Sequence, residues 1–415
     1  MSNPSVLILA LLMPIAVSAV ELIKPLRISD KGTPDYVQVE GVEAGPFNPQ
    51  FWETNAPYLV PDIRFPLLTP LEGKYRNIYA PSAVETPTGY RLFYGAWDGV
   101  PNGKDRLYSL GTDANFQTMT DRRTIVVPGT YEHICNVNAV RLENGSFIML
   151  GTLFPTTNNL NKPAFFQSDT TGTNWNGRIG EPYTVTDADI VTINGYSANS
   201  DINGMNVILP EDGVYRLYFG DFKNFAGVQR ATSSDGKHYT YEALVLPGRY
   251  AVNDIKTFQV GTTKYYLMGL HMNRSQLWFA LSTNGLRFDT PITLLTSQNE
   301  SDRFIVAQGW VVRGAPSDPN RKLVGVLYGA GATSLLNENR IFARWFQKKA
   351  VFVSEDGTRY SGDSAHGPDR QLLKIPAGNR KGHFELYAED QTTLIGRSAP
   401  LTINSGQTYR LLREP

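Results

Sequence analysis

Apolar and polar residues alternate in short runs along most of the chain, and turns rich in Gly, Asn and Asp separate the runs. Alternation with a period of two predicts β-strands, whereas long stripes with the helical period of 3.6 are missing. One turn recurs: Ser233-Ser234-Asp235-Gly236-Lys237-His238-Tyr239 stands between two such runs, and 282–288 and 354–360 share its layout. Weaker copies begin at Thr112 and Ser168. An Asp-Gly pair between alternating runs indicates a β-hairpin.

The five copies mark five repeated units. Each unit contains an apolar first strand, a polar turn with Gly, an aromatic second strand that ends in Gly, and a third strand before the hairpin. The first and second strands are predicted at 77–84 and 90–97, 136–142 and 147–151, 203–209 and 215–220, 253–258 and 264–269, and 308–312 and 322–329. A β-unit repeated at this spacing is typical of a propeller blade. We therefore predict an all-β fold, a five-bladed β-propeller at 20–362 with a small C-terminal β extension at 363–415.

The two ends of the chain carry separate signals. An apolar run at 6–20 ends in Val17-Ser18-Ala19, which suits signal peptidase, although no basic residue precedes the run. We expect 1–19 to be a signal peptide and the protein to be secreted or periplasmic; the alternative is a buried N-terminal strand. The Pro-rich segment 21–70 is a candidate for the strand that closes the last blade. The segment 363–415 forms either a separate small sheet or part of that blade.

Composition excludes several classes of partner. The 39 basic and 39 acidic residues balance, so neither nucleic acid nor an anionic membrane surface is expected as a partner. The apolar run at 6–20 is too short for a membrane span. Cys135 is the single cysteine, so there is no internal disulfide, and we expect its thiol to be buried. The oligomeric state stays open.

Propeller geometry narrows the search for chemistry. The first strand of a blade lines the central channel and the second returns antiparallel to it, so first-strand starts and second-strand ends open on one face. The carboxylates predicted there are candidates for acid, base or nucleophile: Asp201, Asp254, Asp98, Asp221 and Glu132. The polar and aromatic side chains predicted there are candidates for sugar binding: Asn77, Trp97, His133, Asn136, Asn203, His271, Arg274, Gln308 and Trp310. Asp and Asn are also common at strand edges, so each has a structural alternative.

The blade order, the segment Tyr79-Ala80-Pro81-Ser82, the aromatic strand at 90–97 and the Ser-x-Asp-Gly hairpins resemble the five-bladed propeller glycosidases. That group includes glycoside hydrolase families 43, 32, 68 and 117. The resemblance implies acids at the starts of the first three inner strands. Here the first two places hold Asn77 and Asn136, and Asp201 keeps an acid in the third. Either the acids have moved to other blades or the chain binds glycans without cleaving them.

We therefore expect a secreted glycoside hydrolase that cleaves a polysaccharide or oligosaccharide with two carboxyl groups in the central pocket. The alternative is a non-catalytic glycan-binding propeller. The sequence contains no phosphate loop, nucleotide fingerprint or zinc motif, so no cofactor or catalytic metal is expected. A structural calcium ion among Asp and Asn oxygens stays open.

Overall fold

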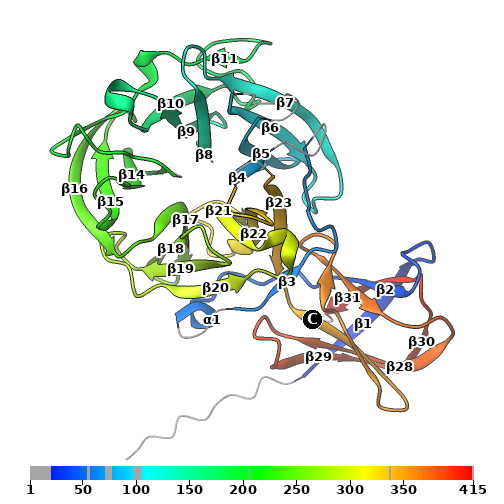
Figure 1. Cartoon of the computed structure of the whole chain (residues 1–415). Coiled ribbons are helices and arrows are strands. Elements are labelled where there is room, and N and C mark those ends of the chain that lie inside the picture. The colour runs from blue at the N-terminus through cyan, green and yellow to red at the C-terminus, as the bar shows by residue number, and fades with distance from the viewer. Residues whose placement is uncertain are drawn as a thin grey trace, which may run out of the picture.

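The computed structural model of the chain describes residues 20–53, 57–70, 77–97, 104–204, 206–335 and 338–413. The predicted signal peptide at 1–19 lies outside the described residues. The five-bladed β-propeller is confirmed, because five separate sheets surround one axis (Figure 1). Their first strands β4, β8, β13, β17 and β21 contact one another around the axis, and β21 contacts β4 to complete the circle. In the part of the chain that the structure describes, no helix is long and apolar enough to cross a membrane.

The consecutive strands of each blade pair antiparallel and are ordered from the axis outward, and in two blades a short extra strand pairs parallel at the outer edge. Blade one comprises β4 (Ile78–Thr86), β5 (Gly89–Ala96), β6 (Arg106–Thr112) and β7 (Met119–Val127), with β11 (Tyr183–Thr184) beside β7. Blade two comprises β8 (His133–Arg141), β9 (Phe147–Phe154) and β10 (Lys162–Ser168). Blade three comprises β13 (Val207–Glu211), β14 (Val214–Gly220), β15 (Gly227–Ser233) and β16 (His238–Pro247), with β12 (Thr192–Asn194) beside β16.

Blades four and five complete the ring. Blade four comprises β17 (Ala251–Val260), β18 (Thr263–His271), β19 (Gln276–Ser282) and β20 (Ile292–Thr296). Blade five comprises β21 (Phe304–Arg313), β22 (Lys322–Gly331), β23 (Arg340–Phe346) and β3 (Leu59–Pro61). Short 3-10 helices lie at Thr157–Asn159, Asp187–Asp189 and Glu300–Asp302, and one short helix, α1, at Gln50–Glu53.

Closure of the ring explains why the fifth hairpin copy lies elsewhere. The outer strand of blade five, β3, comes from the N-terminal segment and pairs antiparallel with β23. The sequence made the segment 21–70 a candidate for the strand that closes the last blade. Within that segment, β3 is the strand that pairs with β23 and closes blade five. Since β3 is not continuous with β23, blade five has no hairpin between its third and fourth strands. The copy at 354–360 instead joins two strands of a second module.

The hydrophobic core lies between neighbouring blades. Phe93 of blade one packs edge-on against Phe147 and Trp175 of blade two, with ring centroids 5.8 and 5.7 Å apart. Trp52 of α1 is fully buried between blades four and five, against Phe279. Burying a large aromatic side chain of this kind contributes about 3 kcal/mol, so α1 fastens the N-terminal segment to the ring.

The glycines that end several second strands let the next blade approach. A Cβ atom on Gly269 would lie 2.3 Å from Gln308 of blade five, and one on Gly329 would lie 3.1 Å from Tyr79 of blade one. The repeated Gly in the sequence therefore reflects close contact between blades around the axis.

The second module is a sheet whose strands come from both ends of the chain. It comprises β1 (Glu21–Ser29), β2 (Tyr36–Glu40), β24 (Lys349–Ser354), β25 (Arg359–Ser361), β26 (Ser364–Ala365), β27 (Arg370–Lys374), β28 (Arg380–Tyr387), β29 (Leu394–Ser398), β30 (Leu401–Ile403) and β31 (Thr408–Arg413). The predicted C-terminal β extension is thus a separate sheet, but it begins before the boundary predicted at residue 363. The reason is backbone pairing: β1 inserts between β29 and β31, and β2 between β31 and β27. These strands share one core, which includes Val37, Phe352 and Phe384.

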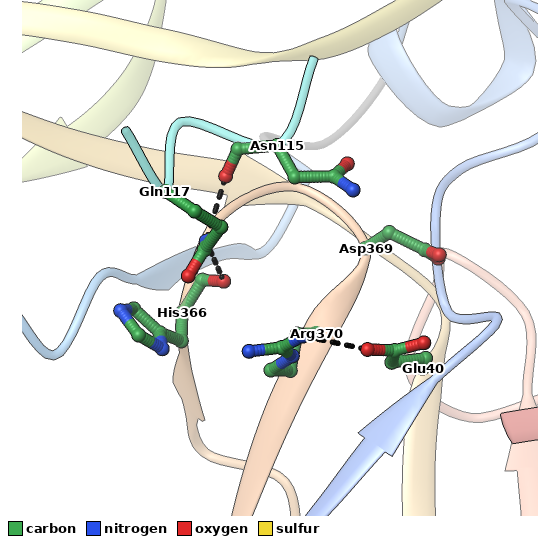
Figure 2. Close-up of a pocket in the computed structure, with 6 residues that line it drawn as sticks. All are labelled: Glu40, Asn115, Gln117, His366, Asp369 and Arg370. Carbon is green, nitrogen blue, oxygen red and sulfur yellow. Dashed lines mark hydrogen bonds and ion pairs between the residues drawn. The ribbon is translucent and has the colours of Figure 1, made fainter. Parts of the chain in front are cut away.

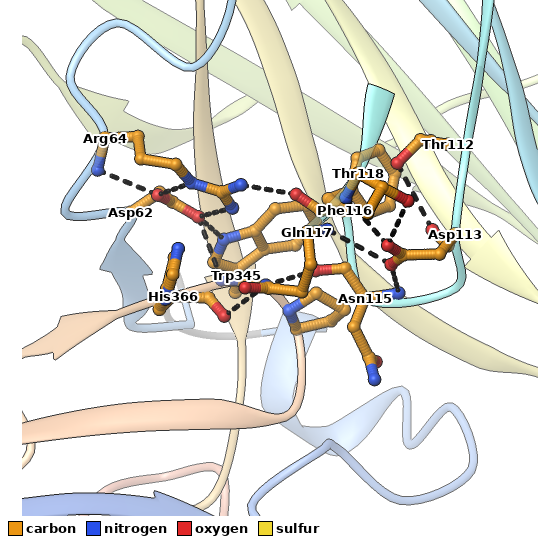
Figure 3. A network of polar contacts seen from close by, with 12 residues as sticks. Asp62, Arg64, Thr112, Asp113, Asn115, Phe116, Gln117, Thr118, Trp345 and His366 are labelled. Carbon is orange, nitrogen blue, oxygen red and sulfur yellow. Dashed lines mark hydrogen bonds and ion pairs between the residues drawn. The ribbon is translucent and has the colours of Figure 1, made fainter. Parts of the chain in front are cut away.

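The two modules are joined by a buried carboxylate (Figure 3). Asp62, which follows β3, accepts hydrogen bonds from Trp345 Nε1 at 2.7 Å and from the Gly367 backbone nitrogen at 2.9 Å. Arg64 pairs with the same carboxylate at 2.8 Å and also donates to the Phe116 carbonyl in blade one. Asp62 therefore connects blade five, the blade-one hairpin and the second module.

Candidate functional site on the bulged face

Four of the five first strands carry a β-bulge near their start. The pairing with the second strand shifts at 79–82 in β4, 135–138 in β8, 252–254 in β17 and 305–307 in β21. In the first two bulges Ala80 and Asn136 adopt positive φ angles of 53° and 52°. Bulges re-aim side chains and are common beside active sites. We call the end of the propeller at which these strands begin the bulged face, and it is the candidate site.

Asp105 lies on the bulged face, directly before β6, and is 9% exposed. The Tyr79 hydroxyl donates a hydrogen bond to Asp105 Oδ2 at 2.8 Å. The other oxygen, Oδ1, is buried without a hydrogen-bond partner among the described residues. Burial raises the pKa of Asp105 to about 7, and the Tyr79 hydrogen bond offsets only part of this effect. A carboxyl whose pKa is raised toward neutral pH can both donate and accept a proton there.

Tyr79 and Cys135 surround this carboxyl with neutral groups. Burial and the nearby Asp105 raise the pKa of the Tyr79 hydroxyl well above its ordinary value, so the hydroxyl stays protonated. Cys135 is buried, as the sequence predicted, and burial raises the pKa of its thiol as well. A thiol held neutral is a poor nucleophile. Of these three groups, Asp105 is the one suited to proton transfer.

Amide side chains line the junction of blades two and three. Asn136 Nδ2 donates to Asn203 Oδ1 at 3.3 Å, which brings together two residues that the sequence placed in the site. The Gly204 backbone nitrogen donates to the same Asn203 oxygen at 2.6 Å, and Thr152 Oγ1 donates to the Gly204 carbonyl at 2.7 Å. Both asparagines are half-buried, so their remaining polar atoms can reach a ligand.

His271 ends β18 on the bulged face and is buried beside Asn253. The Asn253 side-chain amide lies 2.7 to 3.0 Å from His271 Nδ1. Burial lowers the pKa of His271 to about 4, although contact with Asn273 opposes the shift. The imidazole is therefore neutral at pH 7 and can offer one donor and one acceptor.

Asp201 and Asp221 hold a loop that displays an aromatic ring. Asp221 Oδ1 accepts hydrogen bonds from the backbone nitrogens of Asp201 and Lys223, each at 3.0 Å, and the Phe222 nitrogen donates to the Asp201 carbonyl at 2.8 Å. Asp221 is 1% exposed, so its carboxylate stabilises the backbone of this loop. Phe222 is 40% exposed and packs edge-on against Phe225 at 5.1 Å. An exposed ring held in this way can stack on the apolar face of a sugar.

Asp254 lies deeper, where it ties inner strands together across the axis. Its Oδ1 pairs with Lys256 Nζ at 2.9 Å and accepts from Asn138 Nδ2 of blade two at 3.1 Å. Its Oδ2 accepts from the Trp310 backbone nitrogen of blade five at 2.9 Å. Asn138 Oδ1 in turn accepts from the Ile208 nitrogen of blade three at 3.1 Å. The Asp254 carboxylate is 1% exposed and is held by these three partners, Lys256, Asn138 and Trp310, so it has a structural role.

Three predicted binding residues are fully buried between blades. Asn77 accepts a hydrogen bond from the Asn339 nitrogen at 2.9 Å, and Gln308 donates to the Trp278 carbonyl at 3.1 Å. The Trp310 ring lies against Trp52, with centroids 6.0 Å apart. The structure therefore brings these side chains to the blade interfaces and not to the open part of the bulged face.

The other predicted residues lie on or near the bulged face. Glu132 is exposed, His133 is half-buried and stacks on Phe154 at 5.1 Å, and Trp97 is partly exposed. Burial lowers the pKa of His133, so this imidazole is also neutral. Arg274 is exposed, and its carbonyl accepts from the Ile305 nitrogen at 2.8 Å. Asp98 lies outside the described residues.

Sequence reasoning missed Asp105, Tyr79 and Phe222. Asp105 stands at the start of a third strand. The sequence analysis considered only first-strand starts and second-strand ends, although third strands also begin at this face. Tyr79 and Phe222 resemble ordinary strand and loop aromatics in the sequence. Only the bulge in β4 and the hydrogen bonds of the 221–224 loop reveal that both reach the bulged face.

Metal binding finds no support in the described part of the chain. No three His, Cys, Asp or Glu side chains there gather closely enough to hold a metal ion. The structural calcium ion stays a prediction.

Comparisons with known proteins assign this chain to no family. No protein-family model matches the sequence, and no curated protein matches it. A solved glycosyl hydrolase from Bacteroides ovatus is 13% identical, with a TM-score of 0.49 over 73% of this chain and 96% of that chain. A family 32 β-fructofuranosidase from Bombyx mori is 12% identical, with a TM-score of 0.44 over 88% of this chain and 94% of that chain.

A third solved structure comes from work on the family 130 mannoside phosphorylases, described as containing glycoside hydrolases that target β-1,2-mannosidic linkages in Candida mannan. It is 12% identical, with a TM-score of 0.48 over 71% of this chain and 95% of that chain. Since all three TM-scores are below 0.5, these similarities say nothing about activity or site residues. Function therefore has to be inferred from the bulged face itself.

Proposed function

We propose that this protein is a glycoside hydrolase whose site lies on the bulged face. The observation that carries the proposal is the Asp105 carboxyl, which is buried beside Tyr79, has one oxygen without a partner among the described residues, and has a pKa raised to about 7. Glycoside hydrolysis needs a carboxyl group that is protonated at the working pH and can donate to the leaving oxygen. Asp105 meets that requirement and is the proposed general acid.

The second carboxyl group would come from the same face. Asp201 is half-buried, with Oδ1 accepting two hydrogen bonds from Asn161 at 2.8 Å, and Glu132 is exposed. Asp98 is a third candidate. A carboxyl about 5 to 5.5 Å from Asp105 would act as a nucleophile with retention, whereas one about 6.5 to 9.5 Å away would activate water with inversion.

The remaining residues of the bulged face would bind sugar. Asn136 and Asn203 present amide donors and acceptors, which suit paired hydroxyls. His271 contributes as a neutral hydrogen-bonding group, and Phe222 offers a face for the apolar side of the ring. This set of polar and aromatic groups is typical of a pocket that recognises carbohydrate.

A second candidate function is glycan binding without cleavage. The specific observation in its favour is that two predicted acids, Asp254 and Asp221, are held in structural contacts. The first two inner strands also begin with Asn77 and Asn136 at the places where the family resemblance implies acids. On this reading Asp105 would be a buried structural carboxyl.

One experiment separates the two functions. Purified protein is incubated with a panel of neutral and acidic polysaccharides, and reducing ends and bound polysaccharide are both measured. We expect hydrolysis of one class, and a loss of at least about a hundredfold in Asp105→Asn. Asp235→Asn, in an exposed hairpin, is the matched control and should retain activity. Binding without new reducing ends would establish the second function, and full activity of Asp105→Asn would refute the role of Asp105.

We also propose export with cleavage near Ala19, which the apolar run and its small-residue end support. The N-terminus of the protein recovered from the medium or periplasm, determined by mass spectrometry, tests this. An intact Met1 on a cytoplasmic protein would contradict it.

A further inference from the structure

A polar groove of about 490 Å³ lies on the second module, away from the bulged face. Its walls include Lys31, Gln38, Glu40, His366, Arg370 and Thr408. Glu40, His366 and Arg370 also line a narrower pocket that continues to Gln117 of the blade-one hairpin (Figure 2). The groove therefore leads from the loop between β1 and β2 toward the propeller.

Three charges lie in a row across three strands, and two of them, Glu40 and Arg370, line the groove. Glu40 on β2 lies opposite Arg370 on β27 and opposite Arg410 on β31. Its carboxylate pairs with Arg370 at 2.6 Å and with Arg410 at 2.8 Å. The two guanidinium groups hold the pKa of Glu40 below its ordinary value even though burial opposes this. The Glu40 carboxylate is thus shared by Arg370 and Arg410, and these three side chains together carry a net positive charge.

Further titratable groups of both signs lie near the groove. Lys31 at the groove edge is exposed and brings a further cation. Asp369, at the narrow end, faces backbone donors: its Oδ1 accepts from the nitrogens of Gly41 and Glu43 at 3.1 and 2.8 Å. Asp30 accepts from Gln407 Nε2 at 3.2 Å. Burial and the nearby Arg64 lower the pKa of His366, so its ring stays neutral at pH 7.

Uncharged hydrogen-bonding groups accompany the cations. Gln38 and Thr408 face each other across β2 and β31 beside the charged row. Gln117 donates to the carbonyls of Asn115 and His366, each at 2.8 Å, and so fixes the narrow end against the propeller (Figure 2). The groove thus combines guanidinium and ammonium donors for an anion with amide and hydroxyl groups for sugar hydroxyls.

We propose that this groove is an accessory site for an anionic glycan, in which Arg370 and Lys31 bind the carboxylate or sulfate groups of the sugar. The anionic group follows from the two cations, Lys31 and Arg370, that line the wide groove beside the Glu40 carboxylate, whereas the choice of a glycan rests on the proposed function. A guanidinium that already shares its carboxylate with a second arginine keeps further N–H donors for an oxyanion. The two modules are fastened together by Asp62, so the groove has a fixed position relative to the bulged face. Binding there would tether an acidic polymer to the molecule that carries the bulged face.

The test measures binding separately from hydrolysis. Affinity electrophoresis uses polygalacturonate, dextran sulfate and neutral dextran, with wild type, Lys31→Gln, and the double variant Lys31→Gln/Arg370→Gln. The control is Arg178→Gln/Arg287→Gln, which removes the same charge from exposed turns on the propeller. We expect both anionic polymers to bind and dextran not to bind. The dissociation constant should rise about tenfold or more in the double variant, and less in Lys31→Gln, with no change in the control.

The outcomes separate the groove from the bulged face. Binding of polygalacturonate alone assigns a carboxylate ligand, and binding of dextran sulfate alone assigns a sulfate. Equal binding of dextran, or an equal loss in the control variant, would overturn the proposal. Lys31→Gln loses only an exposed side chain, so it reports on binding even if the double variant unfolds. Asp105→Asn should bind as wild type does. If no polysaccharide is cleaved but the binding of anionic polymers depends on Lys31 and Arg370, the result would refute the proposed hydrolase function and support the groove as a binding site.

Discussion

The Asp254 carboxylate accepts a hydrogen bond from the Trp310 backbone nitrogen at 2.9 Å, and this contact joins blade four to blade five at the axis. The same carboxylate holds Lys256 and Asn138, so one buried side chain connects inner strands of three blades. A residue that begins an inner strand in the sequence can therefore close the channel instead of facing a ligand. This distinction decides which substitutions should affect stability and which should affect activity.

Asp254→Ala should lower the free energy of unfolding by about 3 to 5 kcal/mol. The reason is that the change leaves the Lys256 ammonium buried without its partner, together with unpaired N–H groups. Urea denaturation measures the effect. Glu300→Gln is the control, because Glu300 pairs with Arg303 at 3.1 Å with side chains 84% and 66% exposed, and it should cost less than about 0.5 kcal/mol. Equal stability of the two variants would contradict the axial role.

Asp105 should make the protein less stable as pH rises from about 4 to about 7. Its pKa is raised to about 7 in the folded state, from an ordinary value of 3.8, so the folded state binds the proton more tightly across that window. A difference of about three pKa units corresponds to roughly 3 to 4 kcal/mol. Denaturation of wild type and Asp105→Asn at pH 4 and pH 8 measures it. The variant should lose less stability between the two values, and parallel curves would show that Asp105 is not shifted.

Phe222→Ala should weaken carbohydrate binding about fivefold while the fold stays intact, since losing one aromatic stacking face costs about 1 kcal/mol. Isothermal titration with the best ligand of the polysaccharide panel measures this. Phe222→Tyr should bind as wild type does. Leu244→Ala removes an exposed apolar side chain on β16 and serves as control. A similar loss in both alanine variants would mean that Phe222 has no special role.

Asp62→Ala should loosen the second module from the propeller. The change removes the acceptor shared by Trp345, Gly367 and Arg64, and we expect a loss of about 2 to 4 kcal/mol. Calorimetry should show two transitions in place of one. Asp363→Ala, whose carboxylate lies 3.5 Å from Lys349 and is 66% exposed, is the matched control at the same junction. A single transition at the wild-type temperature in Asp62→Ala would rule out this fastening.

The Asp62 contacts also imply acid sensitivity. The hydrogen bond and charge of Arg64 hold the pKa of Asp62 below its ordinary value, although burial opposes them. The stability that this carboxylate contributes is present above the ordinary pKa and is lost as pH falls through the lowered value. Asp62→Ala should therefore differ from wild type at neutral pH and converge with it in strong acid, as monitored by denaturation.

The repeat of alternating strands was enough to predict five blades, because backbone pairing and side-chain alternation are local properties that each blade expresses in its own residues. The same local reasoning assigned one of the five hairpins to the wrong sheet. The hairpin at 354–360 has the layout of the others but belongs to the second module, since blade five takes its outer strand β3 from the N-terminal segment. A closure contact between residues nearly three hundred positions apart leaves no local signature.

The sequence by itself determined the β architecture and the blade count, and it predicted the end of the propeller at which chemistry should be sought. It could place Asn136, Asn203 and His271 on the bulged face, because strand direction follows from alternation and turns. Only the tertiary structure decided which carboxylates are free for chemistry. Asp254 and Asp105 both stand near strand starts, but Asp254 is held by a buried cation, whereas Asp105 is buried with one oxygen that has no partner in the described part of the chain. Burial and charge partners come from distant blades, and they set the proton affinity that chemistry requires.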